Sequence, residues 1–268
     1  SVERDFSITY RNPWTLFYRI PTRIKYFHEE EVDKSQNYKI IEDGLTYSIL
    51  FNKDRATRYE INSTVEIVQS NDNRSPLREL NIKYISNKIR NPLNPEGGRY
   101  LSLSSSLYGT ILGGEKHFYK LQGEYRKYVQ VSNNSVFAFR MFTGYIYNLD
   151  DSYSLDRLYK FRIGGQTSLR GWKSPDTYND NGGLINDMLN LEYRFPLWKN
   201  IGGELFIDIG RLYNEIDQIA KTELDWDCGF GLIYTTPLGP IRIDIAFPFQ
   251  DGYLSQEYQP HASLLYMF

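Results

Sequence analysis

Residues 161–172 read FRIGGQTSLRGW and lie inside the longest segment without strand alternation, Asn148 to Ile185. The Gly164-Gly165 pair and Gly171 permit backbone conformations that few other residues adopt, and Arg170 stands between them. A loop of this length in a compact β protein is usually functional or disordered. Paired glycines, an arginine and a tryptophan favour an ordered loop with a defined backbone path.

Apolar and polar residues alternate on both sides of this segment, which is the pattern of β-strands with one apolar and one polar face. The alternation is clearest after it, where Leu189, Leu191 and Tyr193 alternate with Asn190 and Glu192. Eight such runs precede the long segment and five follow it. No helical period competes with them, so the sequence predicts an all-β fold.

The composition indicates the environment of this sheet. Aromatic residues make up 16% of the 268 residues, yet the mean hydropathy is −0.52. A transmembrane β-barrel produces both values together, because apolar lipid-facing residues alternate with polar residues that face the lumen. No apolar run of about 18 residues is present, which excludes a membrane helix. Since open sheet edges are not tolerated in hydrocarbon, we expect a closed, antiparallel, up-and-down transmembrane barrel.

Several function classes find no support in the sequence. A net charge of −2 gives no reason to expect a nucleic-acid partner. Cys228 is the single cysteine, so no intrachain disulfide can form. No Gly-Lys-Ser/Thr follows the glycines, as a phosphate-binding loop would require. The three histidines lack metal-ligand spacing and are expected at the surface or rim: they are His28, His117 and His261.

Acidic residues on the later strands have two interpretations. Asp225, Asp227 and Asp244 could form paired carboxylates for acid–base chemistry. Lining of a polar lumen explains them more simply. We therefore expect no catalytic residue, no metal, no cofactor and no enzymatic activity.

Several segments together resemble the BamA/TamA-type superfamily, which includes outer-membrane assembly factors and two-partner-secretion transporters. Residues 169–172 are similar to its (V/I)RG(F/Y) loop motif, and residues 206–210 resemble its F-x-D-x-G strand motif. Residues 236–244 are similar to its next-to-last hairpin, and residues 91–98 resemble a turn three strands before the loop. The motif residues are Gly164, Gly165, Leu169, Arg170, Gly171 and Trp172 in the loop, Phe206 and Gly210 in the strand, and the C-terminal aromatic residues Tyr266 and Phe268.

The resemblance implies a single barrel domain over residues 1–268, with the loop 148–185 folded into the lumen. It also implies that Arg170 pairs with acidic residues at matching positions. Strand parity places Glu192 and Asp208 on the lumen face of the two strands that follow the loop, and a guanidinium fork suits carboxylates. The alternative is a solvated loop arginine above an ordinary polar lumen. Either arrangement anchors a loop and performs no catalysis.

The sequence is compatible with two strand counts for the barrel. The family's usual barrel has sixteen strands, which 268 residues with one long loop do not comfortably supply. We expect twelve strands, with the run near Phe6 outside the barrel and Glu29 to Gln36 as a solvated loop. The first barrel strand is then Leu16 to Phe27 and the last is Pro260 to Phe268. The alternative is part of a sixteen-stranded barrel whose other strands lie before Ser1.

The function implied by the resemblance is assisted insertion or export of polypeptides at the outer membrane of a Gram-negative-type bacterium. Clients would pass a lateral seam where the first and last strands pair weakly. Expected partners are membrane lipids, unfolded or nascent outer-membrane polypeptides and periplasmic accessory proteins, although the chain carries no recognisable periplasmic POTRA domain. The alternatives are a passive small pore or a membrane-anchor barrel. A barrel enzyme would need a His with a Ser or Asp partner near one rim, and no such cluster is evident.

Overall fold

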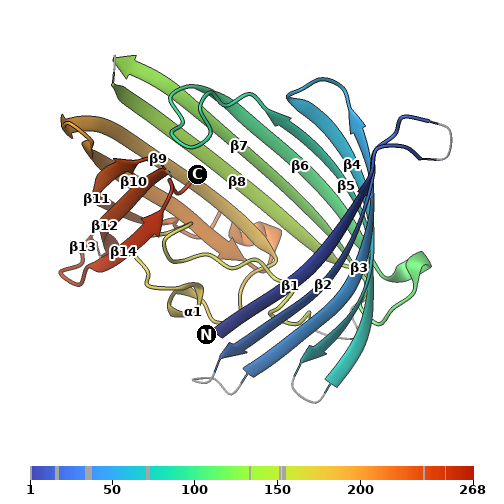
Figure 1. Ribbon diagram of the computed structural model, residues 1–268. Coiled ribbons are helices and arrows are strands. Elements are labelled where there is room, and N and C mark those ends of the chain that lie inside the picture. The colour runs from blue at the N-terminus through green and yellow to red at the C-terminus, as the bar shows by residue number, and fades with distance from the viewer. Residues whose placement is uncertain are drawn as a thin grey trace. The chain divides into compact units, whose positions relative to one another are not determined.

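The computed structural model describes residues 2–15, 18–33, 38–70, 73–132, 134–150, 152, 155–237, 239–250 and 252–268. In these residues fourteen strands form one sheet, in which β1 to β13 follow the order of the chain and β14 pairs with β12 (Figure 1). The strands are β1 (Val2–Asn12), β2 (Thr22–Asp33), β3 (Tyr38–Asn52), β4 (Thr57–Ser70), β5 (Asn73–Asn87), β6 (Gly98–Tyr108), β7 (Phe118–Ser132), β8 (Ser135–Asn148), β9 (Ile185–Trp198), β10 (Ile201–Tyr213), β11 (Asp225–Thr236), β12 (Gly239–Gln250), β13 (Tyr253–Leu254) and β14 (Gln259–Leu264). The all-β, antiparallel, up-and-down fold class is confirmed.

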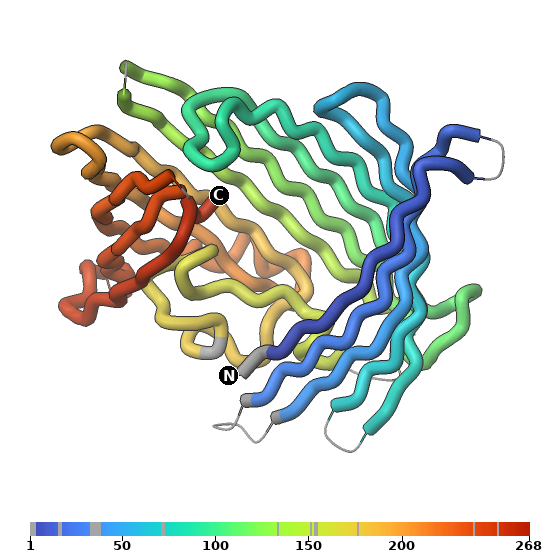
Figure 2. Tube along the Cα trace, viewed as in Figure 1, coloured from blue at the N-terminus to red at the C-terminus, as the bar shows by residue number. Residues whose placement is uncertain are grey.

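Helical structure is confined to short pieces in the described residues. The α-helix α1 (Pro175–Tyr178) lies in the long segment between β8 and β9, drawn in yellow in Figure 2. Two 3₁₀ turns, Thr110–Leu112 and Ile216–Gln218, connect strands. None of these helices has the length and apolar character needed to cross a membrane.

The expected count of twelve strands is wrong, because the run around Phe6 is a full strand of the sheet. Its strand, β1, pairs with β2 along its whole length, from Val2 opposite Val32 to Asn12 opposite Thr22. The first strand is therefore β1 and not Leu16 to Phe27, of which Leu16 lies outside the described residues. The sequence shows the alternation of this run, but it does not show the pairing with β2 that makes the run part of the sheet.

The expected loop from Glu29 to Gln36 is also wrong over its first part. Residues 29–33 continue β2 and pair with β3, where Glu30 forms an ion pair of 2.8 Å with Lys39. Residues 34–36 lie outside the described part of the chain. Strands of outer-membrane barrels extend beyond the apolar band of the bilayer, so a charged run can remain strand.

Residue contacts divide the chain into two compact units. Unit 1 comprises residues 1–85, 103–121 and 147–155, and unit 2 comprises residues 86–102, 122–146 and 156–268. In unit 1 the face of β1 that carries Phe6, Ile8 and Tyr10 leaves these side chains more than half exposed. Hydrogen bonds between polar side chains lie inside, for example from Asn81 Nδ2 to Ser104 Oγ and to Ser106 Oγ, both 2.8 Å. This inside-out arrangement is typical of a sheet that faces lipid.

In unit 2, strands β9 to β12 likewise have apolar side chains on the exposed face and polar side chains on the buried face. Leu205, Ile207, Ile241 and Ile243 are exposed on one face. The opposite face is buried and carries most of the charged residues, namely Glu192, Arg194, Glu204, Asp208, Asp227, Arg242 and Asp244. The long loop lies on this polar face, and the candidate site forms between the two.

The last strand is shorter than expected. β14 begins at Gln259 and ends at Leu264, so the expectation of a strand from Pro260 to Phe268 is wrong over its last four residues. Leu265 adopts a φ of 73°, which turns the chain out of the strand. Phe268 is then buried against Tyr128, Val136 and Ala138.

Candidate functional site

The glycine pair of the loop shapes the turn that presents Arg170. Gly164 and Gly165 have φ values of 118° and 90°, a region that favours glycine. The Gly165 N–H donates to the carbonyl oxygens of Leu169, at 3.0 Å, and Trp172, at 2.9 Å. The N–H of Gly164 donates to Ser168 Oγ at 2.7 Å. These bonds close residues 164–172 into a compact turn.

Arg170 is fully buried and binds both carboxylates that the sequence singled out. Its Nε and Nη2 donate to Asp208 Oδ2 and Oδ1, at 2.7 and 2.9 Å, which is a two-pronged contact. Its Nη1 donates to Glu192 Oε1 at 2.9 Å and to Glu204 Oε1 at 3.3 Å. The structure therefore brings Arg170, Glu192 and Asp208 together, with Glu204 as a further partner.

The strand motif supports the guanidinium from one side. The carbon at the centre of the Arg170 guanidinium lies 3.5 Å from the centroid of the Phe206 ring, a cation–π geometry. The ring occupies space above Gly229, where an added Cβ would lie 2.3 Å from Phe206 Cζ. At Gly210, the last residue of the strand motif, there is no room for a side chain. A Cβ added to Gly210 would lie 2.9 Å from the carbonyl oxygen of Asp187.

The residues around Arg170 pack closely against the sheet. Leu169 is fully buried. A Cβ on Gly171 would lie 2.6 Å from Asp227 Cβ and 3.0 Å from Pro248 Cα. The loop backbone therefore approaches β11 and β12 at a distance that glycine alone permits.

Trp172 fastens the end of the turn to α1. Its ring meets the Tyr178 ring edge to face, with centroids 5.2 Å apart. The Tyr178 hydroxyl donates to Asp225 Oδ2 at 2.5 Å. Burial, together with the hydrogen bond to this carboxylate, raises the pKa of Tyr178, so that its hydroxyl remains a donor.

Three further side chains hold the loop backbone. Asn190 Nδ2 donates to the Ser168 carbonyl oxygen at 2.8 Å, and Arg140 Nη1 donates to that of Thr167 at 2.8 Å. His261 Nε2 lies 2.7 Å from the carbonyl oxygen of Arg170. The expectation of a surface or rim position is wrong for His261, because β14 carries this half-buried side chain to the loop.

Earlier in the loop, Phe161 packs on β8. An added Cβ on Gly144 would lie 2.3 Å from Phe161 Cζ, so the ring lies directly on the glycine. Phe161 and Gly183 exchange two backbone hydrogen bonds of 2.9 Å, which join an early part of the loop to its last residues. This contact is independent of Arg170.

Two more arginines complete the buried cluster. Arg242 lies 2.9 Å from Asp244, 3.5 Å from Glu192 and 3.7 Å from Glu204. Arg194 donates through Nε to Glu192 Oε2 at 2.9 Å. The cluster holds three arginines and five acids, a formal charge of 3 − 5 = −2 if all are ionised. The acids are Glu192, Glu204, Asp208, Asp227 and Asp244.

Sequence reasoning missed Glu204 and Arg242 as partners in this cluster. Strand alternation places Glu204 on the same face as Asp208, four residues away, which was an available signal. The register that brings β12 to this position is not local, so Arg242 had no comparable signal. Tyr266 and Phe268 lie beside the cluster at Arg194: the centroids of their rings lie 3.8 and 5.7 Å from its guanidinium carbon.

The arrangement suits mechanical anchoring. Within the described residues, no three His, Cys, Asp or Glu side chains are placed to hold a metal ion. Removing one partner of a buried ion pair costs about 3–5 kcal/mol, because the other charge is left without compensation. The cluster therefore fixes the loop on the sheet.

Comparison with known proteins places this fold. The model of the Omp85 superfamily domain matches residues 1–261. BamA from Haemophilus ducreyi, in a crystal structure lacking POTRA domains 1–3, has a TM-score of 0.80 and 16% identity over 97% of this chain and 62% of its own. CdiB from Acinetobacter baumannii and CdiB from Escherichia coli each have a TM-score of 0.59 over 97% of this chain, with 13% and 12% identity.

The chain spans 62% of the BamA chain and 49% and 52% of the two CdiB chains. At these identities the structural likeness shows a shared barrel-type fold. The family match is of a different kind, because it covers nearly the whole sequence. By that match, this chain belongs to the Omp85 superfamily.

Proposed function

We propose that this chain handles polypeptides at the outer membrane of a Gram-negative-type bacterium and assists their insertion or export along an edge of its sheet. The observation that carries the proposal is the Omp85 superfamily match over residues 1–261. The fold shared with BamA and CdiB supports it. The partners are membrane lipids, unfolded or nascent outer-membrane polypeptides and periplasmic accessory proteins. The action is non-covalent and needs no catalytic residue.

The edge of β1 is the proposed template. β1 stands at one end of the strand order, with β2 as its neighbour. An unpaired backbone group in hydrocarbon costs several kcal/mol, so such an edge has a strong tendency to pair with an extended segment. Strand addition of this kind gives affinity through main-chain hydrogen bonds.

The loop favours this proposal over a passive pore. It covers the polar face of β9 to β12, and Arg170 holds it there through carboxylates on β9 and β10. The anchored loop leaves less of this polar face free to line a path for water and ions. The sheet edge remains as the surface on which a client can act.

Disulfide cross-linking between a client strand and a cysteine on β1 would test whether the β1 edge acts as the template. In a Cys228→Ser background, we place cysteine at Ile8 on β1, or at Val129 on the interior strand β7 as a matched control. Both side chains are exposed and apolar. During insertion of an unfolded outer-membrane barrel into liposomes, a cysteine in the client strand should form a disulfide with the β1 position at least ten times as often as with the β7 position.

Equal capture at both positions during active insertion would contradict the edge template. Single-channel recording on the same liposomes separates the other function. Steady conductance without assisted insertion would assign the chain to a passive pore, and neither activity would assign it to a membrane anchor.

A further inference from the structure

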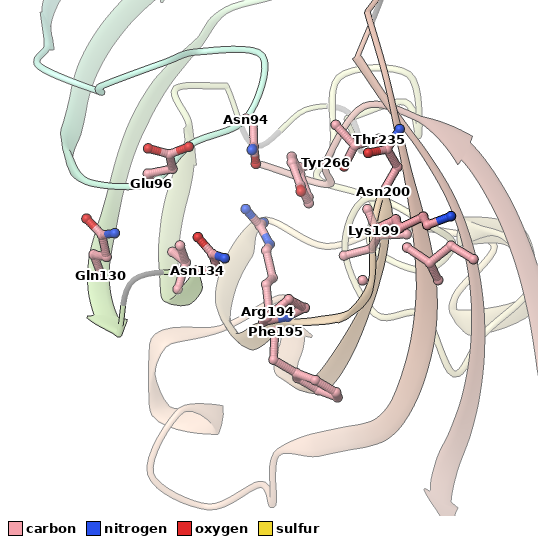
Figure 3. A pocket seen from close by; sticks show the side chains of 15 residues that line it. Asn94, Glu96, Gln130, Asn134, Arg194, Phe195, Lys199, Asn200, Thr235 and Tyr266 are labelled. Carbon is pink, nitrogen blue, oxygen red and sulfur yellow. The ribbon is translucent and has the colours of Figure 1, made fainter.

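Unit 2 contains a cavity of about 230 Å³ at the end of its short hairpins (Figure 3). Asn134, in the turn between β7 and β8, and Asn200, in the turn between β9 and β10, both line it. The long loop joins β8 and β9 at the other end of the strands. Short turns of outer-membrane barrels face the periplasm, so this cavity opens on the periplasmic side.

Arg194 lies in the middle of this cavity and is not fully paired. The exposed fraction of its side chain is 6%. Nε and Nη2 both donate to Glu192 Oε2, and the Tyr266 ring covers one face of the guanidinium. Among the described residues, Nη1 has no hydrogen-bond partner. A buried, charged donor without an acceptor is unfavourable and marks a place for one.

The cavity has the size and lining for a small acceptor group. Its volume is below the roughly 300–1,000 Å³ of sites for drug-sized ligands, and it suits a group about the size of one residue. Asn94, Asn134 and Asn200 supply amide donors around Arg194, as Figure 3 shows. Glu96 and Lys199 are both exposed and opposite in charge, so their effects on a ligand largely offset each other.

We propose that this cavity binds a carboxylate, which accepts a hydrogen bond from Arg194 Nη1. A planar carboxylate matches the guanidinium edge, and the amides can donate to its remaining lone pairs. The carboxylate belongs either to an acidic residue of an extended peptide or to a small organic acid. The proposal does not depend on insertion activity, because it concerns binding to the folded chain.

The site also connects to the loop. Glu192 accepts hydrogen bonds from Arg194 through one oxygen and from Arg170 through the other. A carboxylate at Nη1 therefore shares the Arg194 cation with Glu192, which weakens the attraction between Arg194 and Glu192 without displacing either hydrogen bond. Glu192 is then left to bind Arg170 more strongly, so occupancy of the cavity should protect the loop from protease.

Ligand-observed NMR on the full chain in detergent micelles would test this site. The probes are N-acetyl-glutamate N-methylamide, its neutral glutamine analogue, succinate and inorganic phosphate. We expect the glutamate probe to bind at least ten times more tightly than the glutamine analogue. Tighter binding than succinate would identify a peptide source, and weaker binding would identify a small organic acid.

Two variants make the assignment specific. Arg194→Gln should abolish the preference for glutamate over glutamine. Thr235→Trp fills the exposed side of the cavity without removing Arg194 or Glu192, and should weaken the glutamate probe at least ten-fold. Binding undiminished in Thr235→Trp, equal binding of the two amide probes, or preference for phosphate over all carboxylates would overturn the proposal.

Discussion

At the scale of single residues, the Arg170 side chain joins the loop to two strands through charged groups. Its five donors in a fixed fork reach Asp208 and Glu192 at the same time. A lysine ammonium lacks this planar fork of donors. The neighbouring carboxylates depend on it in turn, because they are buried and cannot be solvated.

We predict that Arg170→Ala lowers the free energy of unfolding by about 3–5 kcal/mol, because it leaves buried carboxylates without their cation. Arg170→Lys should restore only part of this loss, because one ammonium group cannot bind both carboxylates in the same way. Urea titration followed by heat-modifiable gel mobility would measure the change. Loop cleavage by protease should increase in the same order.

The matched control is Lys173→Ala, which removes an exposed cation three residues further along the same loop. It should change neither stability nor cleavage. Wild-type protection in Arg170→Lys would show that charge alone holds the loop and that the fork is dispensable.

At the scale of elements, strand register decides which residues meet. Phe206 on β10 lies opposite Glu192 on β9 and Gly229 on β11. Three neighbouring strands therefore place the Glu192 carboxylate, the Phe206 ring and Gly229, which has no side chain, side by side. The ring extends over the glycine, and the guanidinium rests on the ring. Three strands thus contribute to one binding surface for the loop.

We predict that Gly229→Ala loosens the loop although Gly229 does not touch Arg170. The added methyl group would meet both the Phe206 ring and the Ile245 carbonyl oxygen, at 2.3 and 2.1 Å. Overpacking of this kind costs about 1–3 kcal/mol and would displace the ring. Limited proteolysis of the loop and thermal unfolding would both report it.

Gly202→Ala serves as the comparison, because the nearest atom to its added Cβ, the Phe195 carbonyl oxygen, lies 3.2 Å away. This substitution should leave loop cleavage unchanged. If the two alanine variants behave alike, the fit between Phe206 and Gly229 does not support the loop.

At the scale of the whole molecule, the directions of the strands restrict how the sheet can close. β13 and β14 both pair with β12, so the fourteen strands occupy thirteen positions. In an up-and-down order, the first and thirteenth positions run in the same direction. β1 and β14 therefore cannot form an antiparallel pair with each other, and antiparallel closure needs an odd number of additional strands between them.

We predict that cysteines at Ile8 on β1 and Ala262 on β14 do not form a direct disulfide in the folded protein in a Cys228→Ser background. One intervening strand would separate the two by about 9–10 Å, beyond disulfide reach. Cysteines at Ile8 and Tyr26, which are cross-strand partners, are the positive control. An efficient bond between the Ile8 and Ala262 positions would instead show that the two strands close the sheet in parallel.

The sequence by itself determined the features that depend on local spacing. Alternation of period two specifies strands and their two faces wherever they occur, which gave the all-β class and the shared face of Glu192 and Asp208. The glycine pair and Arg170 marked an ordered loop, because positive φ values and a lone motif cation are local properties. The motif resemblance then placed Arg170 opposite these acids.

Tertiary structure decided what depends on register and on chain ends. The strand around Phe6 was misjudged, because its pairing with β2 is what makes it a strand. Glu204 and Arg242 join the cluster because antiparallel register brings β10 and β12 to the loop, and His261 reaches Arg170 because β14 lies beside β12. These contacts join residues far apart in the chain. Each buried charge needs a partner to offset its lost solvation, and the partners come together only in the folded sheet, which no local pattern contains.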